Sequence, residues 1–174
     1  MPERTIRLYH TSSEPIRRIT EGRFGAWLFF ALDPYQMHAG QTNYLYRIDL
    51  PANEVITASS LFYEDNTRLQ AKRLEALAER LAEDVNANTC LEVDSDTAYD
   101  LIGEADNLYR LLSDAECYED NAAEVDWRIQ LAAAEAAKIL GYRAVEVTDE
   151  QGTAYMVAIA GKKKAWGFAL VRTD

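Results

Sequence analysis

The sequence of 174 residues predicts an α+β fold, in which a mixed sheet of about six strands is split by a helical insertion. Near both ends of the chain, hydrophobic residues alternate with polar ones, which is the period of a half-buried strand. In the middle they recur every three or four residues, which is the period of an amphipathic helix. Because strands and helices are segregated, the order favours α+β over alternating βαβ units. We expect one domain over residues 1–174, with an acidic helical insertion at about 59–120.

Three strands are predicted in the first fifty residues. In the segment 4–10, Ile6 and Leu8 lie on the same face as His10. Residues 27–31 form a short apolar strand, and residues 43–50 form a strand in which tyrosines alternate. Pro51 ends this last strand, because proline lacks the backbone N–H that a sheet requires.

Three helices are predicted in the middle of the chain. Residues 66–85 carry one apolar stripe, which consists of Leu74, Leu77, Leu81 and Val85. Residues 96–112 repeat this pattern more weakly, so we expect one further helix there. The pattern is strongest over residues 121–140, and Gly141 is a natural C-terminal stop.

The sheet is predicted to resume after Gly141, where the hydrophobic period returns to two. Strands over 142–147 and 153–159 are separated by the turn-forming residues 149–152, so they are expected to form a hairpin with a four-residue loop. A last strand is expected over 166–171.

The charge of the chain is unevenly distributed. The 29 acidic and 18 basic residues give a net charge of −11, but residues 54–126 alone carry −14 and the rest carry +3. A protein that binds nucleic acid by neutralising phosphates needs the opposite sign. We therefore expect no direct nucleic-acid binding, and a basic, nucleic-acid-handling host protein as the partner of the acidic segment.

Several classes of site and location are disfavoured by the sequence. Cys90 and Cys117 fit no CxxC spacing, so neither a disulfide framework nor a zinc site is predicted, and no other metal motif is present. The longest apolar run has about 6 residues, whereas a membrane span needs about 20. We expect a cytoplasmic protein without a membrane partner.

The first candidate site is the sequence His10-Thr11-Ser12 at the end of the first strand. An imidazole and two hydroxyls can hold a ribose, and a free backbone edge can hold a carboxamide. The alternative is a half-buried histidine at a strand end, followed by two residues that only form the turn.

The second candidate site is the segment 22–31, in which Gly22 and Gly25 allow a ligand to approach the backbone closely. The aromatic rings beside them can enclose a flat, cationic ring. The alternative is a turn followed by a core strand. Phe29 and Phe30 point to opposite faces of that strand, so at least one of them is expected in the core.

The third candidate is the acidic stretch that follows the long helix. Glu146 and Thr148 share one strand face, and Asp149 lies where the turn can direct it into a cleft. The alternative is a solvated hairpin turn, which is the commoner role of such residues.

Taken together, these segments resemble the ADP-ribosyltransferase fold, and more narrowly the phage anti-CRISPR ADP-ribosyltransferases that inhibit type I-F CRISPR surveillance complexes. The resemblance covers about a third of the chain and is most specific in the last stretch. Its stretches are Leu8-Tyr9-His10-Thr11-Ser12, Gly22-Arg23-Phe24-Gly25-Ala26-Trp27-Leu28-Phe29, the helix around Trp127 and Gln130, and residues 141–153.

The resemblance implies an ADP-ribosyltransferase-like sheet and a mono-ADP-ribosyltransferase with NAD as co-substrate. The modified protein would be a DNA-recognising subunit of a CRISPR effector in the host bacterial cytoplasm. His10, Thr11 and Ser12 would lie on the NAD-holding strand end, and Phe24 and Gly25 would line the nicotinamide side.

Further roles concern the phosphates and the catalytic acid. Asp149 would be the catalytic acid, with Glu146 and Tyr155 as supporting residues. The NAD phosphates would need cations, for which Arg23 is a candidate together with Arg17 and Arg18, and Phe29 would add an aromatic wall.

The sequence departs from related patterns at two positions. Thr11 stands where many transferases of this fold have glycine after the first histidine. Ala154 precedes Tyr155-Met156-Val157, where the poly(ADP-ribose) polymerase type has glutamate. Asp149 would therefore replace that glutamate from the turn.

Two other functions compete with transfer to a protein. One is an acidic, DNA-mimic-like protein that blocks a nucleic-acid-binding partner without catalysis. The other is a NAD-hydrolysing toxin, in which water takes the place of the protein acceptor.

Overall fold

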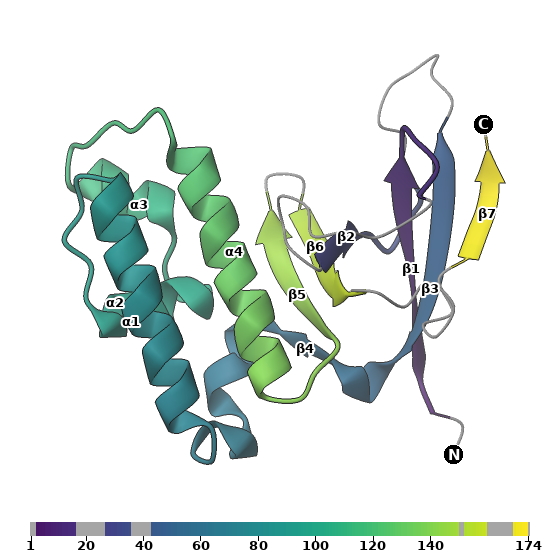
Figure 1. Ribbon diagram of the computed structural model, residues 1–174, viewed down its shortest axis with the longest axis horizontal. Helices are drawn as coiled ribbons and strands as arrows, with labels where there is room; N and C mark the ends of the chain where they lie inside the picture. The colour runs from purple at the N-terminus through teal and green to yellow at the C-terminus, as the bar shows by residue number, and fades with distance from the viewer. Residues whose placement is uncertain (1–2, 17–26, 36–42, 150–151, 160–168, 174) are drawn as a thin grey trace. The chain divides into compact units, whose positions relative to one another are not determined.

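Figure 1 shows the computed structural model, which describes residues 3–16, 27–35, 43–149, 152–159 and 169–173. The chain divides into two units. The first, Met1–Val55 with Arg143–Asp174, contains the sheets except for Ile56 and Thr57 of the short strand β4 (Val55–Thr57), and the second, Ile56–Tyr142, contains the α-helices. The predicted α+β class is therefore confirmed, and each unit is described by itself.

One sheet of the first unit has the strand order β1-β3-β7. Its strands are β1 (Thr5–Ser12), β3 (Tyr44–Pro51) and β7 (Ala169–Thr173). β1 and β3 run antiparallel over their whole length, in a register that pairs Thr5 with Pro51 and Ser12 with Tyr44. The strands predicted over 4–10 and 43–50 are confirmed as β1 and β3. The last strand, predicted over 166–171, is described from Ala169 onward as β7.

The other sheet has the order β2-β6-β5-β4. Its strands are β2 (Trp27–Phe30), β6 (Gly152–Ala158), β5 (Ala144–Asp149) and β4 (Val55–Thr57). The predicted hairpin is confirmed, but the four-residue loop is wrong. Asp149 still pairs with Gly152 across the ladder, so both are strand residues. Gly152 has a φ of +117°, a backbone conformation that residues with a Cβ rarely adopt.

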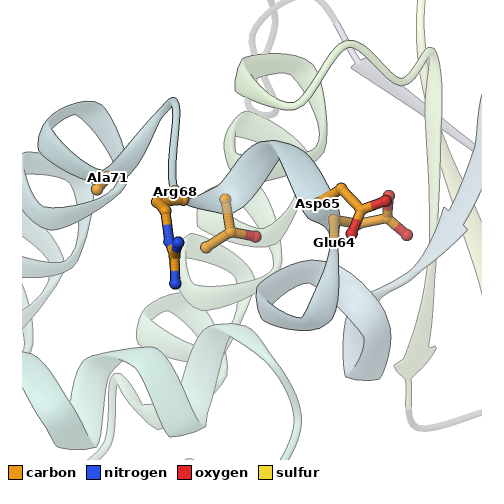
Figure 2. Close-up of a pocket in the computed structure, with 5 residues that line it drawn as sticks. Glu64, Asp65, Arg68 and Ala71 are labelled. Carbon is orange, nitrogen blue, oxygen red and sulfur yellow. The ribbon is translucent and has the colours of Figure 1, made fainter.

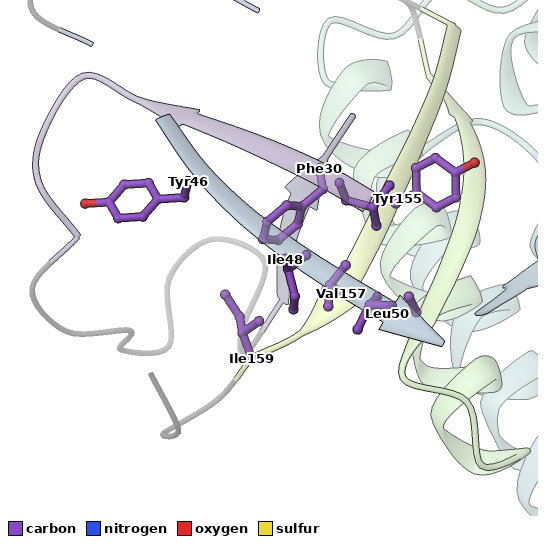
Figure 3. Close-up of a cluster of buried hydrophobic side chains, with 9 residues drawn as sticks. Phe30, Tyr46, Ile48, Leu50, Tyr155, Val157 and Ile159 are labelled. Carbon is purple, nitrogen blue, oxygen red and sulfur yellow. The ribbon is translucent and has the colours of Figure 1, made fainter. Parts of the chain in front are cut away.

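A single apolar core is shared by the two sheets of this unit (Figure 3). Ile48 and Leu50 of β3 contribute from one sheet, and Phe30, Tyr155 and Val157 contribute from the other. Alternation explains this set, because every second residue of a strand points to the same face. The prediction that Phe29 or Phe30 lies in the core is confirmed for Phe30, which is 1% exposed.

The chain leaves and re-enters the first unit at a clasped pair of residues. Glu54 is the last residue of the short 3₁₀ helix η1 (Ala52–Glu54), and Arg143 precedes β5. The Arg143 backbone N–H donates to the Glu54 carbonyl at 2.9 Å, and the Arg143 guanidinium pairs with the Glu54 carboxylate at 2.8 Å.

The second unit contains α1 (Ala71–Asn88), α2 (Ser95–Ile102), α3 (Leu108–Asp114) and α4 (Ala122–Ile139), with the 3₁₀ helices η2 (Ala58–Tyr63) and η3 (Asp65–Thr67). The predicted stripe of α1 is buried, and α4 is confirmed almost residue for residue. In the described part of the chain no helix is long and apolar enough to cross a membrane.

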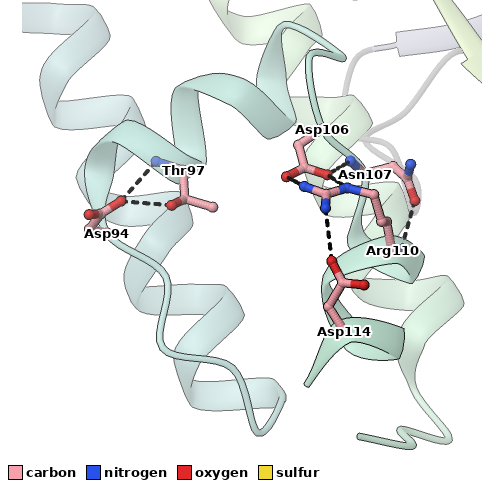
Figure 4. A network of polar contacts seen from close by, with 6 residues as sticks. All are labelled: Asp94, Thr97, Asp106, Asn107, Arg110 and Asp114. Carbon is pink, nitrogen blue, oxygen red and sulfur yellow. Dashed lines mark hydrogen bonds and ion pairs between the residues drawn. The ribbon is translucent and has the colours of Figure 1, made fainter. Parts of the chain in front are cut away.

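The single helix predicted over 96–112 is wrong, since the structure has α2 and α3 there. α2 ends at Gly103, and Glu104 has a φ of +55°, which no α-helix continues through. A new helix then begins at Asn107, whose side chain accepts a hydrogen bond from the Arg110 N–H at 2.9 Å. Asp94 caps α2 in the same way by accepting from the Thr97 N–H (Figure 4).

The two cysteines, for which no disulfide was predicted, are paired as Cys90–Cys117. They lie in the segments after α1 and after α3, with a sequence separation of 27 and a distance of 6.5 Å between their Cα atoms. Sequence spacing alone could not reveal this pair, because the fold of the helices brings the two segments together.

Leu50→Ala tests the packing of the shared core. Leu50 is fully buried, so we expect its truncation to lower the free energy of unfolding by about 2–5 kcal/mol. Urea denaturation measures this value. Leu32→Ala is the matched control, because Leu32 is 51% exposed, and it should change the stability by less than about 1 kcal/mol. Equal effects of the two substitutions would contradict the described core.

Candidate functional site

The candidate site lies where β1 meets the segment that follows β2. Tyr9 and Ala31 exchange two backbone hydrogen bonds, each of 2.8 Å. β1 is thus bonded to β3 along one edge and to Ala31 on its other edge. This bridge brings the His10 end of β1 against the backbone of β2.

The His10 ring has a fixed tautomer and a defined position. Its Nδ1–H donates to the Phe29 carbonyl at 2.6 Å, and since a carbonyl only accepts, the proton of the neutral ring is on Nδ1. The ring centroid lies 5.5 Å from that of Phe30. Burial lowers the pKa of His10, against the opposite effect of the Phe29 carbonyl, so the ring is neutral at neutral pH. Nε2 is left as a hydrogen-bond acceptor.

Thr11 and Ser12 have different roles in the structure. The buried Thr11 hydroxyl donates to the Tyr35 carbonyl at 2.5 Å. The Ser12 hydroxyl donates to the Glu14 carbonyl at 2.6 Å, which is the local turn that was the alternative for this residue. Tyr35 was not predicted to belong to the site. Its contact spans 24 residues of sequence and follows no local pattern.

A second pair of polar groups lies on the sheet face that carries Phe30. The register aligns Phe30 of β2, Tyr155 of β6 and Glu146 of β5 in one row. The Tyr155 hydroxyl donates to Glu146 Oε2 at 2.8 Å. Burial, and then this bond to the carboxylate, raise the pKa of Tyr155 to about 12. The hydroxyl therefore stays protonated and holds the carboxylate in place.

Asp149 lies at the end of β5, three residues beyond Glu146. Strand alternation directs Asp149 and Phe29 to the opposite face from Glu146 and Phe30. Asp149 nevertheless acts electrostatically on Tyr35. Burial raises the pKa of Tyr35, a hydrogen bond with the Thr11 backbone lowers it, and the negative charge of Asp149 raises it further.

The remaining residues named from the sequence fall into two groups. Arg17, Arg18, Arg23, Phe24 and Gly25 lie outside the described residues. Gln130 belongs to the helical unit, where its side-chain amide donates to Asp126 at 3.2 Å.

Among the described residues, one cluster has metal-ligating atoms within reach of each other. It consists of Cys90, Cys117 and Glu119. Since the two sulfurs are bonded to each other, Glu119 is the one remaining ligand of the cluster.

Comparison with known families identifies the chain. Residues 37–165, more than half of the 174, match the model of the family described as anti-CRISPR type I-F ADP-ribosyltransferase AcrIF11. The chain belongs to this family. The matched range includes the β5–β6 hairpin with Glu146, Asp149 and Tyr155, whereas β1 with His10 lies before it.

A solved structure supports the fold of this AcrIF11-family member. The structure, described as the crystal structure of an anti-CRISPR protein, matches 100% of both chains with a TM-score of 0.51 and 23% sequence identity. At 23% identity, this similarity supports a shared fold and carries no information on function. Comparison with curated proteins gave no match.

The lowered pKa of His10 predicts a pH-dependent stability. The unfolded chain takes up the proton near pH 6.5, whereas the folded chain takes it up at lower pH. This contribution to stability is complete above about pH 6.5 and is lost as the pH falls toward the folded value, by at most about 1.4 kcal/mol per pH unit. Urea unfolding at neutral pH and one to two units below measures it. His10→Asn should lose less stability over this range, and equal losses would contradict a buried neutral histidine.

Proposed function

We propose that this protein transfers ADP-ribose from NAD to a protein subunit of a type I-F CRISPR surveillance complex, and so prevents the complex from recognising DNA. The observation that carries the proposal is the membership of an anti-CRISPR type I-F ADP-ribosyltransferase family. The arrangement of two sheets around the His10 strand end is proposed to be the NAD-binding core of that fold.

The described residues offer groups suited to NAD. His10 Nε2 is an acceptor for a ribose hydroxyl, because its partner nitrogen already donates to Phe29. Thr11 and Ser12 are proposed to shape the NAD-holding strand end beside the imidazole, because their hydroxyls already donate to the Tyr35 and Glu14 carbonyls. Phe29, and the residues Arg23, Phe24 and Gly25, are proposed to complete the aromatic and cationic parts of the site.

The carboxylates of Asp149 and Glu146 in the β5–β6 hairpin are proposed to have different roles in the transfer. In the proposed transfer, the bond between the ribose of NAD and its nicotinamide breaks, nicotinamide leaves as a neutral molecule, and the ADP-ribosyl group passes to the acceptor side chain. The carbon that loses nicotinamide becomes more positive as the bond stretches, so a fixed carboxylate nearby stabilises the transition state. We assign this role to Asp149, which can also take the proton of the acceptor side chain. Glu146, held by the Tyr155 hydroxyl, supports the site.

Asp149→Asn tests this assignment. Removing the negative charge should lower kcat/KM for transfer of labelled ADP-ribose by about 100-fold or more, with little change in shape. Glu146→Gln is the matched control on the same strand, and it should have a smaller effect. Scintillation or mass spectrometry of the acceptor measures transfer, and the urea midpoint verifies folding. If Asp149→Asn keeps full activity and Glu146→Gln loses it, the assignment of the catalytic acid is overturned.

A second function is favoured by one observation, the charge of the helical unit. Residues 56–142 carry 19 acidic and 7 basic residues, a net of −12, whereas the remaining 87 residues carry +1. A surface of this sign can occupy a DNA-binding site without catalysis.

The requirement for NAD separates the two functions. For a transferase, inhibition of DNA binding by the surveillance complex should appear only when NAD is present, and should persist after the enzyme is removed. For an acidic competitor, inhibition should appear without NAD and weaken as salt rises. A gel-shift assay with and without NAD measures both. Release of nicotinamide without any labelled protein would instead indicate NAD hydrolysis.

A further inference from the structure

The helical unit contains a pocket that the proposed chemistry does not use. It has a volume of about 530 Å³ and is lined by η2, the start of α1 and the end of α2. Its apolar lining includes Phe62 and Tyr63 of η2, Leu74 of α1 and Tyr99 of α2. We call it the Phe62–Tyr99 pocket.

An aromatic pair forms one wall of this pocket. The rings of Phe62 and Tyr99 meet edge to face, with centroids 4.9 Å apart and an interplanar angle of 87°. Gly103 makes room for them. A Cβ at this position would lie 3.4 Å from the Phe62 ring and 3.3 Å from the Tyr99 carbonyl oxygen. The glycine that ends α2 therefore also lets the Phe62 ring lie close to the end of the helix.

Two carboxylates line the same pocket. Asp100 and Glu104 come from the last turn of α2 and the residue beyond its cap, and both side chains are exposed. Glu104 has a φ of +55°, a position where glycine is usual after a helix. A glutamate there costs stability relative to glycine, and such costs concentrate at functional positions.

The electrostatic field at the pocket is negative. Burial raises the pKa of Tyr99, and the charges of Glu75, Glu79 and Asp96 raise it further. A neighbouring pocket, lined by Glu64, Asp65, Thr67, Arg68 and Ala71, shares Thr67 and Ala71 with the first. Figure 2 shows the residues of this neighbouring pocket, with the Arg68 guanidinium pointing away from the carboxylates of Glu64 and Asp65.

Two large apolar side chains in the segment before α1 are almost fully exposed. Tyr63, which lines the pocket, is 89% exposed, and Leu69 is 81% exposed. Exposed aromatic residues next to a charged rim are typical of surfaces that bind protein partners.

We propose that the Phe62–Tyr99 pocket receives an arginine side chain of the acceptor protein and so docks that protein on the helical unit. The aliphatic stem of arginine packs on apolar walls, and its guanidinium binds aromatic faces and carboxylates at the same time. The net charge of −12 on this unit attracts a basic surface over a longer range. This inference rests on the proposed transfer to a protein.

The double charge reversal Asp100→Lys with Glu104→Lys tests the proposal. The probe is the purified type I-F CRISPR surveillance complex. Its affinity for the variant, measured by biolayer interferometry without NAD, should fall by about tenfold or more. In the transfer assay, KM for the complex should rise by a similar factor while KM for NAD stays unchanged.

Glu83→Lys with Glu92→Lys is the matched control, because it changes the net charge equally at two exposed positions away from the pocket. Tyr63→Ala is a second variant that should not affect folding, since Tyr63 is almost fully exposed, and it should weaken binding about threefold or more. Urea midpoints verify that all variants fold.

The outcomes separate the docking site from the chemistry. If the wild type binds the complex and the pocket variant does not, the docking site stands even when no label is transferred, and the transferase function alone fails. If the pocket variant binds like the wild type, or if the control loses as much affinity, the docking site is overturned. A wild type that does not bind the complex also overturns it.

Discussion

The hydrogen bonds at the end of β1 are the constraint on which the first unit depends. Through Tyr9 and Ala31, and through the imidazole of His10 and the Phe29 carbonyl, β1 is tied to the edge of a second sheet. The shared core can then fill the space between two sheets instead of covering one. The bond to the Phe29 carbonyl also fixes the tautomer of the His10 ring, whose neutral form is favoured by burial, so the packing of the unit sets the chemistry of its strand end.

Local patterns were sufficient for most elements and insufficient for the contacts between them. The alternation around Ile6 and Leu8 predicted β1, and the spacing of Leu74 to Val85 predicted the buried face of α1. The break at Gly103 was missed, because the weak apolar period continues across it while Glu104 reverses the backbone. The alternation of side chains along β2 and β5 places Phe30 and Glu146 on one face of the sheet and Phe29 and Asp149 on the other. This alternation can be predicted from the sequence once the strands are known. Tyr35 had no such signal, since only the tertiary fold brings it to Thr11.

The two units differ in net charge, and this difference fits the separate roles proposed for them. A site for a diphosphate co-substrate benefits from a frame that is not negative, and the strand-rich unit carries a net +1. The helical unit carries all of the excess negative charge, together with exposed aromatic side chains and a pocket of its own. The net charge of −11 of the whole chain therefore comes from the helical unit and does not reflect the charge of the strand-rich unit.

The clasp between Glu54 and Arg143 has a consequence for how this protein can change. The helical unit begins and ends within one hydrogen bond of the same point on the strand-rich unit. A short peptide could therefore span the gap, and a longer or different insert could occupy it, without moving β5. Closure entropy grows only slowly with the length of an insert, so such exchanges are thermodynamically inexpensive. In this architecture the segment between Glu54 and Arg143 can change in length and sequence while the two ends of the strand-rich unit stay joined.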